Sequence, residues 1–220
     1  MPTIRYASEA DRPVLGAINV EAFASSGFLP NTFPQAGRDG LRAFKGAMSL
    51  KHLADPKTHV LVATEPESGT VVGYCRWVIP QGIGYDCQPE PLSDEGAAAV
   101  ADPMQFAPRP MNEGVYNAFK STLEEKRKEH ATDDDLILDF LATLPAHQGK
   151  GVGSMFLRWG LDKADAAQRR VYLEATPEGY PLYCKYGWRA VERVMVDFAP
   201  HGGEGSQSLV IMMRDPDFKE

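Results

Sequence analysis

A glycine-rich turn in the second half of the chain has the residue types and spacing of an anion-binding site. The turn, Gln148 to Gly153, follows an apolar strand candidate and precedes a stretch with helical spacing. Glycine lets a backbone come close to a ligand, and the first amide groups of a helix have no partners within that helix. These amides also carry the positive end of the helix dipole. The sequence therefore predicts an anion site here.

Two common phosphate-binding patterns do not fit this turn. A P-loop requires GxxxxGK followed by Ser or Thr, but Lys150 is followed by Gly151. A dinucleotide turn requires GxGxxG, but Ser154 or Phe156 stands where the third glycine is needed. Glu174 lies about where a ribose-binding acid would lie, yet the chain predicts one βαβ unit rather than the repeated array of dinucleotide-binding folds. A nucleotide-binding oxidoreductase is therefore a distant alternative.

A third pattern, Gln-x-x-Gly-x-Gly at Gln148, Gly151 and Gly153, does fit. Further on, the segment LYCKYGW (Leu182–Trp188) supplies a second motif. The two motifs resemble the acyl-CoA pyrophosphate loop and the LYxKxGF segment of the GNAT N-acetyltransferase superfamily, and they occur in that order. The resemblance is sharp from about Leu136 to Trp188 and extends to the predicted element order over most of the chain.

The resemblance implies a fold and a co-substrate. The fold is a single α/β (α+β mixed) GNAT-like domain over residues 1–220, with a central mixed sheet, helices on both faces and a splayed parallel pair of central strands. The co-substrate is acetyl-CoA, with no metal. Its pyrophosphate would meet the backbone amides of the turn, and its pantetheine arm would pair with the free edge of the preceding strand. The implied cofactor-binding residues are Leu141, Ala142, Thr143, Gln148, Gly149, Lys150, Gly151, Val152, Gly153, Ser154 and Tyr183.

Acetyl transfer from a thioester to an amine needs a deprotonated amine, a stabilised oxyanion and a protonated thiolate leaving group. The resemblance places Tyr183 near the CoA sulfur as general acid. A phenol with a pKa of about 10 can donate to a thiolate of pKa about 8.5. A backbone amide near Leu141 or Ala142 would meet the oxyanion. Tyr183 could instead be one of several core tyrosines, and Thr176 stands where the family often has Asn.

The general base is less well indicated. Asp139 interrupts an otherwise apolar strand, so we expect it to be hydrogen-bonded, ion-paired or directed into a cleft. Desolvation there would raise its pKa towards a useful value. A purely structural Asp139 is an equally good interpretation, Glu174 is a similar candidate at a strand end, and ordered water could relay the proton instead.

The elements that must position these residues follow from periodicity and turn signals. Strands are expected at 3–6, 59–64, 71–79, 136–143, 170–175, 188–198 and 208–214. Helices are expected at 9–24, 41–54, 112–130, 151–167 and 180–186. A loop is expected at 27–40, and a proline-rich irregular insertion at about 80–111.

Composition limits the possible classes of function. The chain has 220 residues and a net charge of −7, which argues against a general nucleic-acid binder. Cys75, Cys87 and Cys184 form no CxxC pair, so neither a disulfide framework nor a zinc site is indicated. No signal peptide or membrane span is evident, and the cytoplasm is the expected compartment.

The sequence thus predicts an acetyl-CoA-dependent N-acetyltransferase that acts on a primary amine by direct attack in a ternary complex. We expect a coenzyme A thioester and a small-molecule amine as partners, and neither nucleic acid nor a membrane. The main alternative is a catalytically silent acyl-CoA-binding sensor. The acceptor and the oligomeric state are not predicted.

Overall fold

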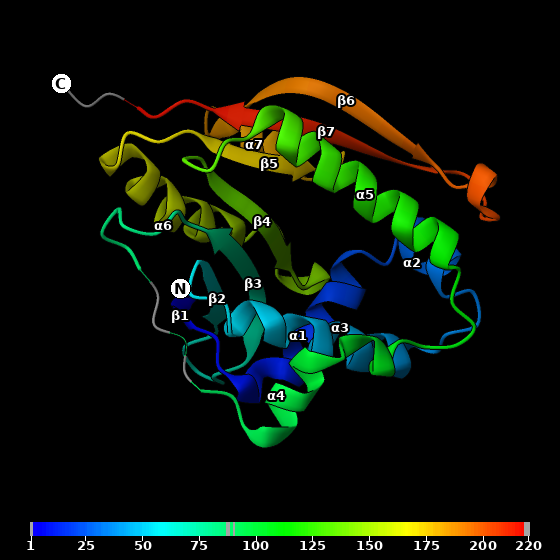
Figure 1. The fold of residues 1–220 in the computed structure, drawn as a ribbon. Helices are drawn as coiled ribbons and strands as arrows, with labels where there is room; N and C mark the ends of the chain where they lie inside the picture. Colours follow the sequence, from blue (N-terminus) through cyan, green and yellow to red (C-terminus); the bar gives the residue numbers. More distant parts are fainter. Residues whose placement is uncertain (1, 87–88, 90, 218–220) are drawn as a thin grey trace. The chain divides into compact units, whose positions relative to one another are not determined.

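A computed structural model describes residues 2–86, 89 and 91–217 (Figure 1). In chain order its elements, with η for a 3-10 helix, are β1 (Thr3–Tyr6), η1 (Glu9–Asp11), α1 (Arg12–Ala22), α2 (Phe28–Thr32), α3 (Arg38–Leu53), β2 (Thr58–Thr64), β3 (Val71–Val78), α4 (Asp94–Ala101), η2 (Pro103–Phe106), α5 (Glu113–His130), β4 (Leu136–Thr143), η3 (Pro145–His147), α6 (Val152–Ala166), β5 (Val171–Ala175), α7 (Tyr180–Lys185), β6 (Arg189–Asp197), η4 (Ala199–His201) and β7 (Ser206–Arg214).

The strands form a seven-stranded mixed sheet with the hydrogen-bonding order β1-β2-β3-β4-β5-β7-β6. β4 and β5 are parallel, and their register consists of the pairs Leu136↔Val171 and Ile137↔Tyr172. β4 nevertheless continues to Thr143, so the two central strands separate after their first residues. The predicted mixed α/β sheet with a splayed parallel pair is confirmed.

The chain divides into two compact units. One contains residues 1–24, 36–108 and 138–161, and the other contains residues 25–35, 109–137 and 162–220. The division falls within β4 and within α6, both of which are continuous elements. The expectation of a single domain over 1–220 remains a prediction, and the two units are described separately below.

In the first unit, helices cover both faces of the sheet. A buried cluster that includes Leu15 and Tyr74 joins α1 to β2, β3 and β4. Trp77, three residues after Tyr74, is buried against α6, where its Nε1 donates to the Phe156 carbonyl at 3.2 Å. A Cβ at Gly160 would lie only 2.2 Å from the Trp77 ring, so α6 packs closely here. Side chains an odd number of positions apart on a strand point to opposite faces, which places α1 and α6 on opposite sides of β3.

In the second unit, an ion pair holds the starts of the two parallel strands. Asp135 precedes β4 and Arg170 precedes β5. Arg170 donates to Asp135 through Nε at 3.0 Å and through a terminal nitrogen at 2.6 Å, and the Leu136 amide donates to the Arg170 carbonyl at 2.9 Å. The strands are therefore joined firmly at one end, before their pairing stops.

Two helices were not expected from the sequence. The predicted loop at 27–40 contains the five-residue helix α2, and the predicted irregular insertion contains the eight-residue helix α4. The Ser93 hydroxyl caps α4 by accepting the Gly96 amide at 3.1 Å. This N-cap offsets the unsatisfied amides of the first turn, which explains a helix where the prolines suggested none. Residues 87, 88 and 90 of the insertion, and with them Cys87, lie outside the described residues.

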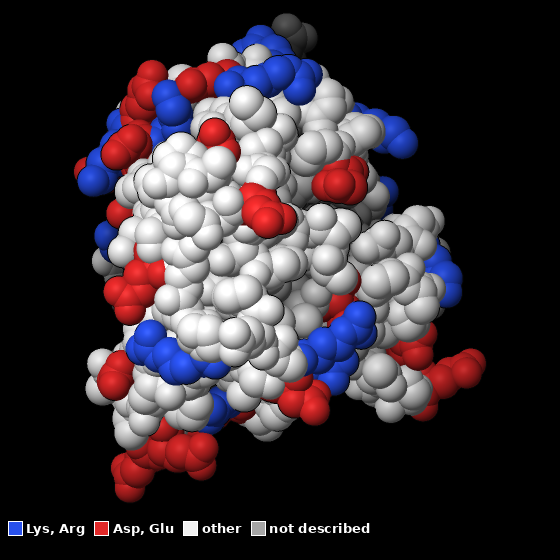
Figure 2. Space-filling view, turned by 90° about the vertical axis from the view of Figure 1, so that its right-hand side faces the viewer, with Lys and Arg blue, Asp and Glu red and all other residues white. Residues whose placement is uncertain are grey.

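The surface carries both charge signs. On the face that Figure 2 shows, separate acidic groups lie within a large uncharged area, both charge signs occur along its margin, and the atoms described form no continuous basic area. Within the described residues, no helix combines the length and the apolar character needed to cross a bilayer.

Candidate functional site

The glycine-rich turn lies in the first unit and is open to solvent. Gly149 and Gly151 have φ angles of +73° and +86°, and a Cβ at either position would meet no atom within 4 Å. The first helical hydrogen bond of this region runs from the Met155 amide to the Gly151 carbonyl at 3.1 Å. The amides of residues 152–154 therefore precede the first hydrogen bond of the helix, and they are oriented as donors at its N-terminus. The left-handed glycines and these amides together form a surface suited to a phosphate group.

Side chains tie this turn to the rest of the first unit. Gln148 Nε2 donates to the Thr143 carbonyl at 3.1 Å, which links the turn to the end of β4. His147 Nε2 lies 2.8 Å from Glu65 Oε1, and this hydrogen bond, more than the nearby charge of Lys150, lowers the pKa of Glu65. Gln148 thus has an intramolecular role that the sequence did not predict, and Lys150 is exposed at the rim of the turn.

Leu141, Ala142 and Thr143 lie on β4 beyond its last pairing with β5 at Ile137. On the other side, β3 packs tightly, since a Cβ at Gly73 would lie 2.8 Å from the Ala142 carbonyl oxygen. The strand therefore combines one well-packed edge with an edge whose pairing with β5 has ended. The residues predicted to bind the pantetheine arm stand directly before the turn on one continuous segment.

Asp139, on the same strand, is ion-paired. Arg76 of β3 donates from Nε to Asp139 Oδ2 at 2.9 Å, and both side chains are 15% exposed. The Arg76 guanidinium also lies 4.8 Å from the centroid of the Phe140 ring. The expectation that Asp139 would be ion-paired or hydrogen-bonded is therefore confirmed, and its role as base remains a prediction.

A second cation, Lys45 of α3, interacts electrostatically with Arg76. Burial lowers the pKa of Lys45 to about 8, and the charge of Arg76 lowers it further in the same direction. Arg76 and Lys45 were missed by sequence reasoning, although Arg76 interrupts an apolar strand just as Asp139 does.

Tyr183 lies in the second unit, on α7. Its side chain is buried, its ring packs edge-to-face on Trp188 with centroids 5.9 Å apart, and a Cβ at Gly179 would lie 3.0 Å from the ring. Thr176 Oγ1 accepts the Gly179 amide at 3.3 Å, so this hydroxyl stabilises the start of α7. Tyr183 is thus fixed by close packing on several sides.

Glu174, the alternative base, is also paired within the second unit. Arg127 of α5 donates to both of its carboxylate oxygens at 3.2 Å, and the Glu174 side chain is 7% exposed. Burial raises the pKa of neighbouring Tyr172, and the charge of Glu174 raises it further. The ion pair with Arg127 therefore explains the buried carboxylate of Glu174, which anchors α5 to β5.

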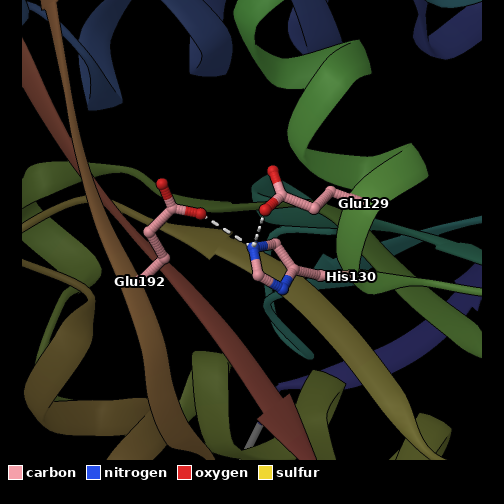
Figure 3. A group of neighbouring side chains, drawn as sticks. All are labelled: Glu129, His130 and Glu192. Carbon is pink, nitrogen blue, oxygen red and sulfur yellow. Dashed lines mark hydrogen bonds and ion pairs between the residues drawn. The ribbon is translucent and has the colours of Figure 1, made fainter.

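A cluster of possible metal ligands, Glu129, His130 and Glu192, joins α5 to β6 (Figure 3). His130 Nε2 lies 2.7 Å from Glu192 and 3.9 Å from Glu129. However, Lys126 Nζ contacts both carboxylates, at 2.8 and 2.7 Å, and its hydrogen bonds to Glu129 and then Glu192 raise the pKa of Lys126 to about 12. Since an ammonium already balances both carboxylates, we interpret the cluster as an ion-pair network.

No family model matches the chain. Among curated proteins, Probable acyltransferase SID5 of Ajellomyces capsulatus is 30% identical over 84 residues, which are 38% of this chain and 56% of that relative. The chain thus spans about half the length of this curated relative.

Solved structures match almost the whole chain. One described as histone acetyltransferase HPA2 and related acetyltransferase, from Corynebacterium glutamicum, has a TM-score of 0.63 and 23% identity over 99% of this chain and 98% of its own. A GCN5-related N-acetyltransferase from Rhodopseudomonas palustris has a TM-score of 0.53 and 15% identity over 98% and 96%. The yncA protein of Salmonella typhimurium, solved with its cofactor acetyl-CoA, has a TM-score of 0.51 and 17% identity over 100% and 96%. The resemblance inferred from the two motifs is confirmed at the level of the fold: this chain has the fold of the GNAT N-acetyltransferases.

Proposed function

We propose that this protein transfers an acetyl group from acetyl-CoA to the primary amine of a small-molecule acceptor. One observation carries the proposal. A strand whose pairing with β5 stops early runs directly into a turn with two left-handed glycines, and that turn opens a helix. A free strand edge followed by a phosphate-binding helix start suits a long ligand that has an amide-bearing arm and a pyrophosphate.

The cofactor-binding roles follow from this arrangement. The pyrophosphate accepts hydrogen bonds from the backbone amides of residues 149–154, and Lys150 adds a positive charge at the rim. The pantetheine arm pairs with the backbone of Leu141, Ala142 and Thr143. Gln148 holds the turn against the end of β4 through the Thr143 carbonyl and so acts mainly on the shape of the turn.

The chemical steps need three groups of this chain. The amine attacks the thioester carbonyl, and a backbone amide near Leu141 or Ala142 stabilises the oxyanion that develops. Tyr183 then donates its phenolic proton to the departing thiolate. Asp139 is our candidate to accept the proton of the amine, and its ion pair with Arg76 fixes the orientation of the carboxylate.

The role of Asp139 can be separated from simple ion pairing. We expect Asp139→Asn to lower kcat about tenfold or more, because a positioned base contributes at least that much, and to change the pH profile of kcat, which reports the ionisation of groups in the substrate complex. Asp165→Asn is the matched control, since it breaks the ion pair with buried Arg214 and the Asp165 side chain is also 15% exposed. A lower melting temperature with an unchanged pH profile would assign Asp139 to the structural support of Arg76 alone.

The small-molecule acceptor is the least specified part of the proposal. Similar structures carry names that refer to acceptors as different as histone and phosphinothricin, so the fold leaves the acceptor open.

The test is an acetyl-CoA screen in which released thiol is measured with polyamines, amino acids, aminoglycosides and a lysine peptide. Turnover with at least one small amine supports the proposal. Binding of acetyl-CoA without turnover of any amine would favour the sensor alternative. A melting temperature that rises with NAD(P)H but not with CoA would contradict the proposal.

A further inference from the structure

A cavity of about 270 Å³ lies in the second unit, where α7 begins beside the β6–β7 hairpin. The residues that matter for its chemistry are Pro177, Tyr180, Arg193, Met195, Ser208 and Val210. Val210 pairs with Ala175, the last residue of β5, and also with Arg193 of β6. The cavity therefore stands at the carboxyl end of β5.

Arg193 is the charged group of this cavity. Its guanidinium lies 5.4 Å from the centroid of the Tyr180 ring. Two neighbours on β6 have ionic partners: Arg189 pairs with Asp215, and Glu192 pairs with Lys126. Arg193, in contrast, makes no ion pair within the described part of the chain. A guanidinium has a planar fork of N–H donors, which suits a planar anion, and its position over the aromatic ring helps to hold it in place.

The remaining walls are largely apolar. Met195, on the same face of β6 as Arg193, is 68% exposed, and Pro177 and Val210 add further apolar surface. Ser208, which pairs with Met195, supplies a hydroxyl. An exposed cation beside an apolar cavity wall matches one negative charge attached to a hydrocarbon group, and a guanidinium fork binds a carboxylate with two parallel hydrogen bonds.

We propose that this cavity binds the carboxylate and adjoining apolar group of the acceptor, so that the preferred substrates are amines that carry a carboxylate. The inference rests on the proposed function, because it concerns the second substrate of that reaction. Tyr180 precedes the proposed general acid Tyr183 by three positions on α7, which is close to one helical turn. A carboxylate held by Arg193 would thus keep the acceptor near Tyr183.

The first test compares matched acceptors. The amines are leucine, methionine, phenylalanine and 6-aminohexanoate, each with its carboxamide. We expect the wild-type protein to prefer the carboxylates by about tenfold or more in kcat/KM, mainly through KM, because a hydrogen-bonded charge pair contributes that much. Arg193→Met should remove the preference and leave the carboxamides unaffected, whereas Arg193→Lys should restore part of it.

Arg189→Met is the matched control, since Arg189 lies on the same strand, is 73% exposed and already pairs with Asp215. The control should keep the wild-type preference. Equal activity on carboxylates and carboxamides in the wild type, or equal losses in both arginine variants, would overturn the proposal.

A second test does not depend on turnover. Isothermal titration with N-acetylleucine and N-acetylleucinamide should show tighter binding of the carboxylate by about tenfold, and Arg193→Met should abolish the difference. If this difference is found but no amine is acetylated, the proposed function fails and the carboxylate site stands. If amines are acetylated but the two ligands bind equally, the site fails. A dimer that Met195→Asp dissociates, together with equal binding of the two ligands, would also overturn the site in favour of self-association.

Discussion

Replacing Tyr183 with Phe is expected to lower kcat for acetyl transfer about a hundredfold or more and to leave the Kd of acetyl-CoA nearly unchanged. The expectation follows from the proposed role, because a general acid that protonates a leaving thiolate typically contributes at least that factor. The Phe ring keeps the packing on Trp188 and against Gly179, so the fold around α7 should persist. Single-turnover kinetics and titration of acetyl-CoA measure the two quantities separately.

Tyr186→Phe is the matched control, since Tyr186 directly follows α7 and also loses only a hydroxyl. It should retain activity within about twofold of the wild type, as expected of a side chain outside the chemistry. Loss of activity in both variants, or full activity of Tyr183→Phe with every amine, would remove Tyr183 from the mechanism.

Asp135→Asn is expected to lower the free energy of unfolding by about 2–3 kcal/mol. The Asp135 side chain is 4% exposed and accepts hydrogen bonds from Arg170 and from the amide and hydroxyl of Thr132. Breaking a fully buried pair costs about 3–5 kcal/mol. We expect a smaller loss here because Arg170 is 43% exposed and keeps part of its hydration. Urea unfolding of the two proteins gives the difference.

The adjacent pair provides an internal control. Asp134 pairs with Arg169 at 3.2 Å, but its side chain is 72% exposed. Asp134→Asn should therefore cost less than about 1 kcal/mol, as is usual for surface pairs. Equal losses for the two variants would contradict the assignment of Asp135 as the residue that holds the starts of β4 and β5 together.

The Asp135–Arg170 pair also predicts that stability depends on pH. Burial alone would raise the pKa of Asp135, but the hydrogen bonds from Arg170 and Thr132 outweigh it and lower the pKa. The folded state then binds fewer protons than the unfolded state, so Asp135 stabilises the fold above the unfolded pKa of about 4. This contribution is lost as the pH falls through the folded pKa. The difference between the wild type and Asp135→Asn should therefore shrink below about pH 4.

The strongly patterned parts of the chain were predictable from sequence. β1 and β4 have the predicted bounds, and α5 begins after Asn112, whose side chain caps it by accepting the Val115 amide at 3.1 Å. These elements combine clear periodicity with a recognisable cap or turn. The helix α4 escaped prediction because only Gly96 and Ala99 are buried in it, which leaves little apolar pattern to detect.

The candidate site was predictable only in part. Asp139 and Arg76 each interrupt an apolar run, and that signal is visible in the sequence. Their pairing requires β3 to lie beside β4, although the insertion and α5 separate the two strands along the chain. The cavity at Arg193 depends on the register of β6 with β7 and on the position of Tyr180, and no motif encodes either.

The central claim is that the turn around Gly151 holds the pyrophosphate of coenzyme A. Titration with acetyl-CoA and with S-acetylpantetheine, which lacks the pyrophosphate, tests it in the wild type, Gly151→Ala and Gly69→Ala. Gly69 is the matched control, since it has a φ of +67°, and a Cβ there would also meet no atom within 4 Å.

We predict that Gly151→Ala weakens acetyl-CoA binding about tenfold, because an alanine at a φ of +86° costs about 1–2 kcal/mol and distorts the turn. S-acetylpantetheine should bind the wild type and Gly151→Ala with the same affinity. Gly69→Ala should bind acetyl-CoA as tightly as the wild type does. Failure of the wild type to bind acetyl-CoA, or equal acetyl-CoA affinities in all three proteins, would contradict the claim.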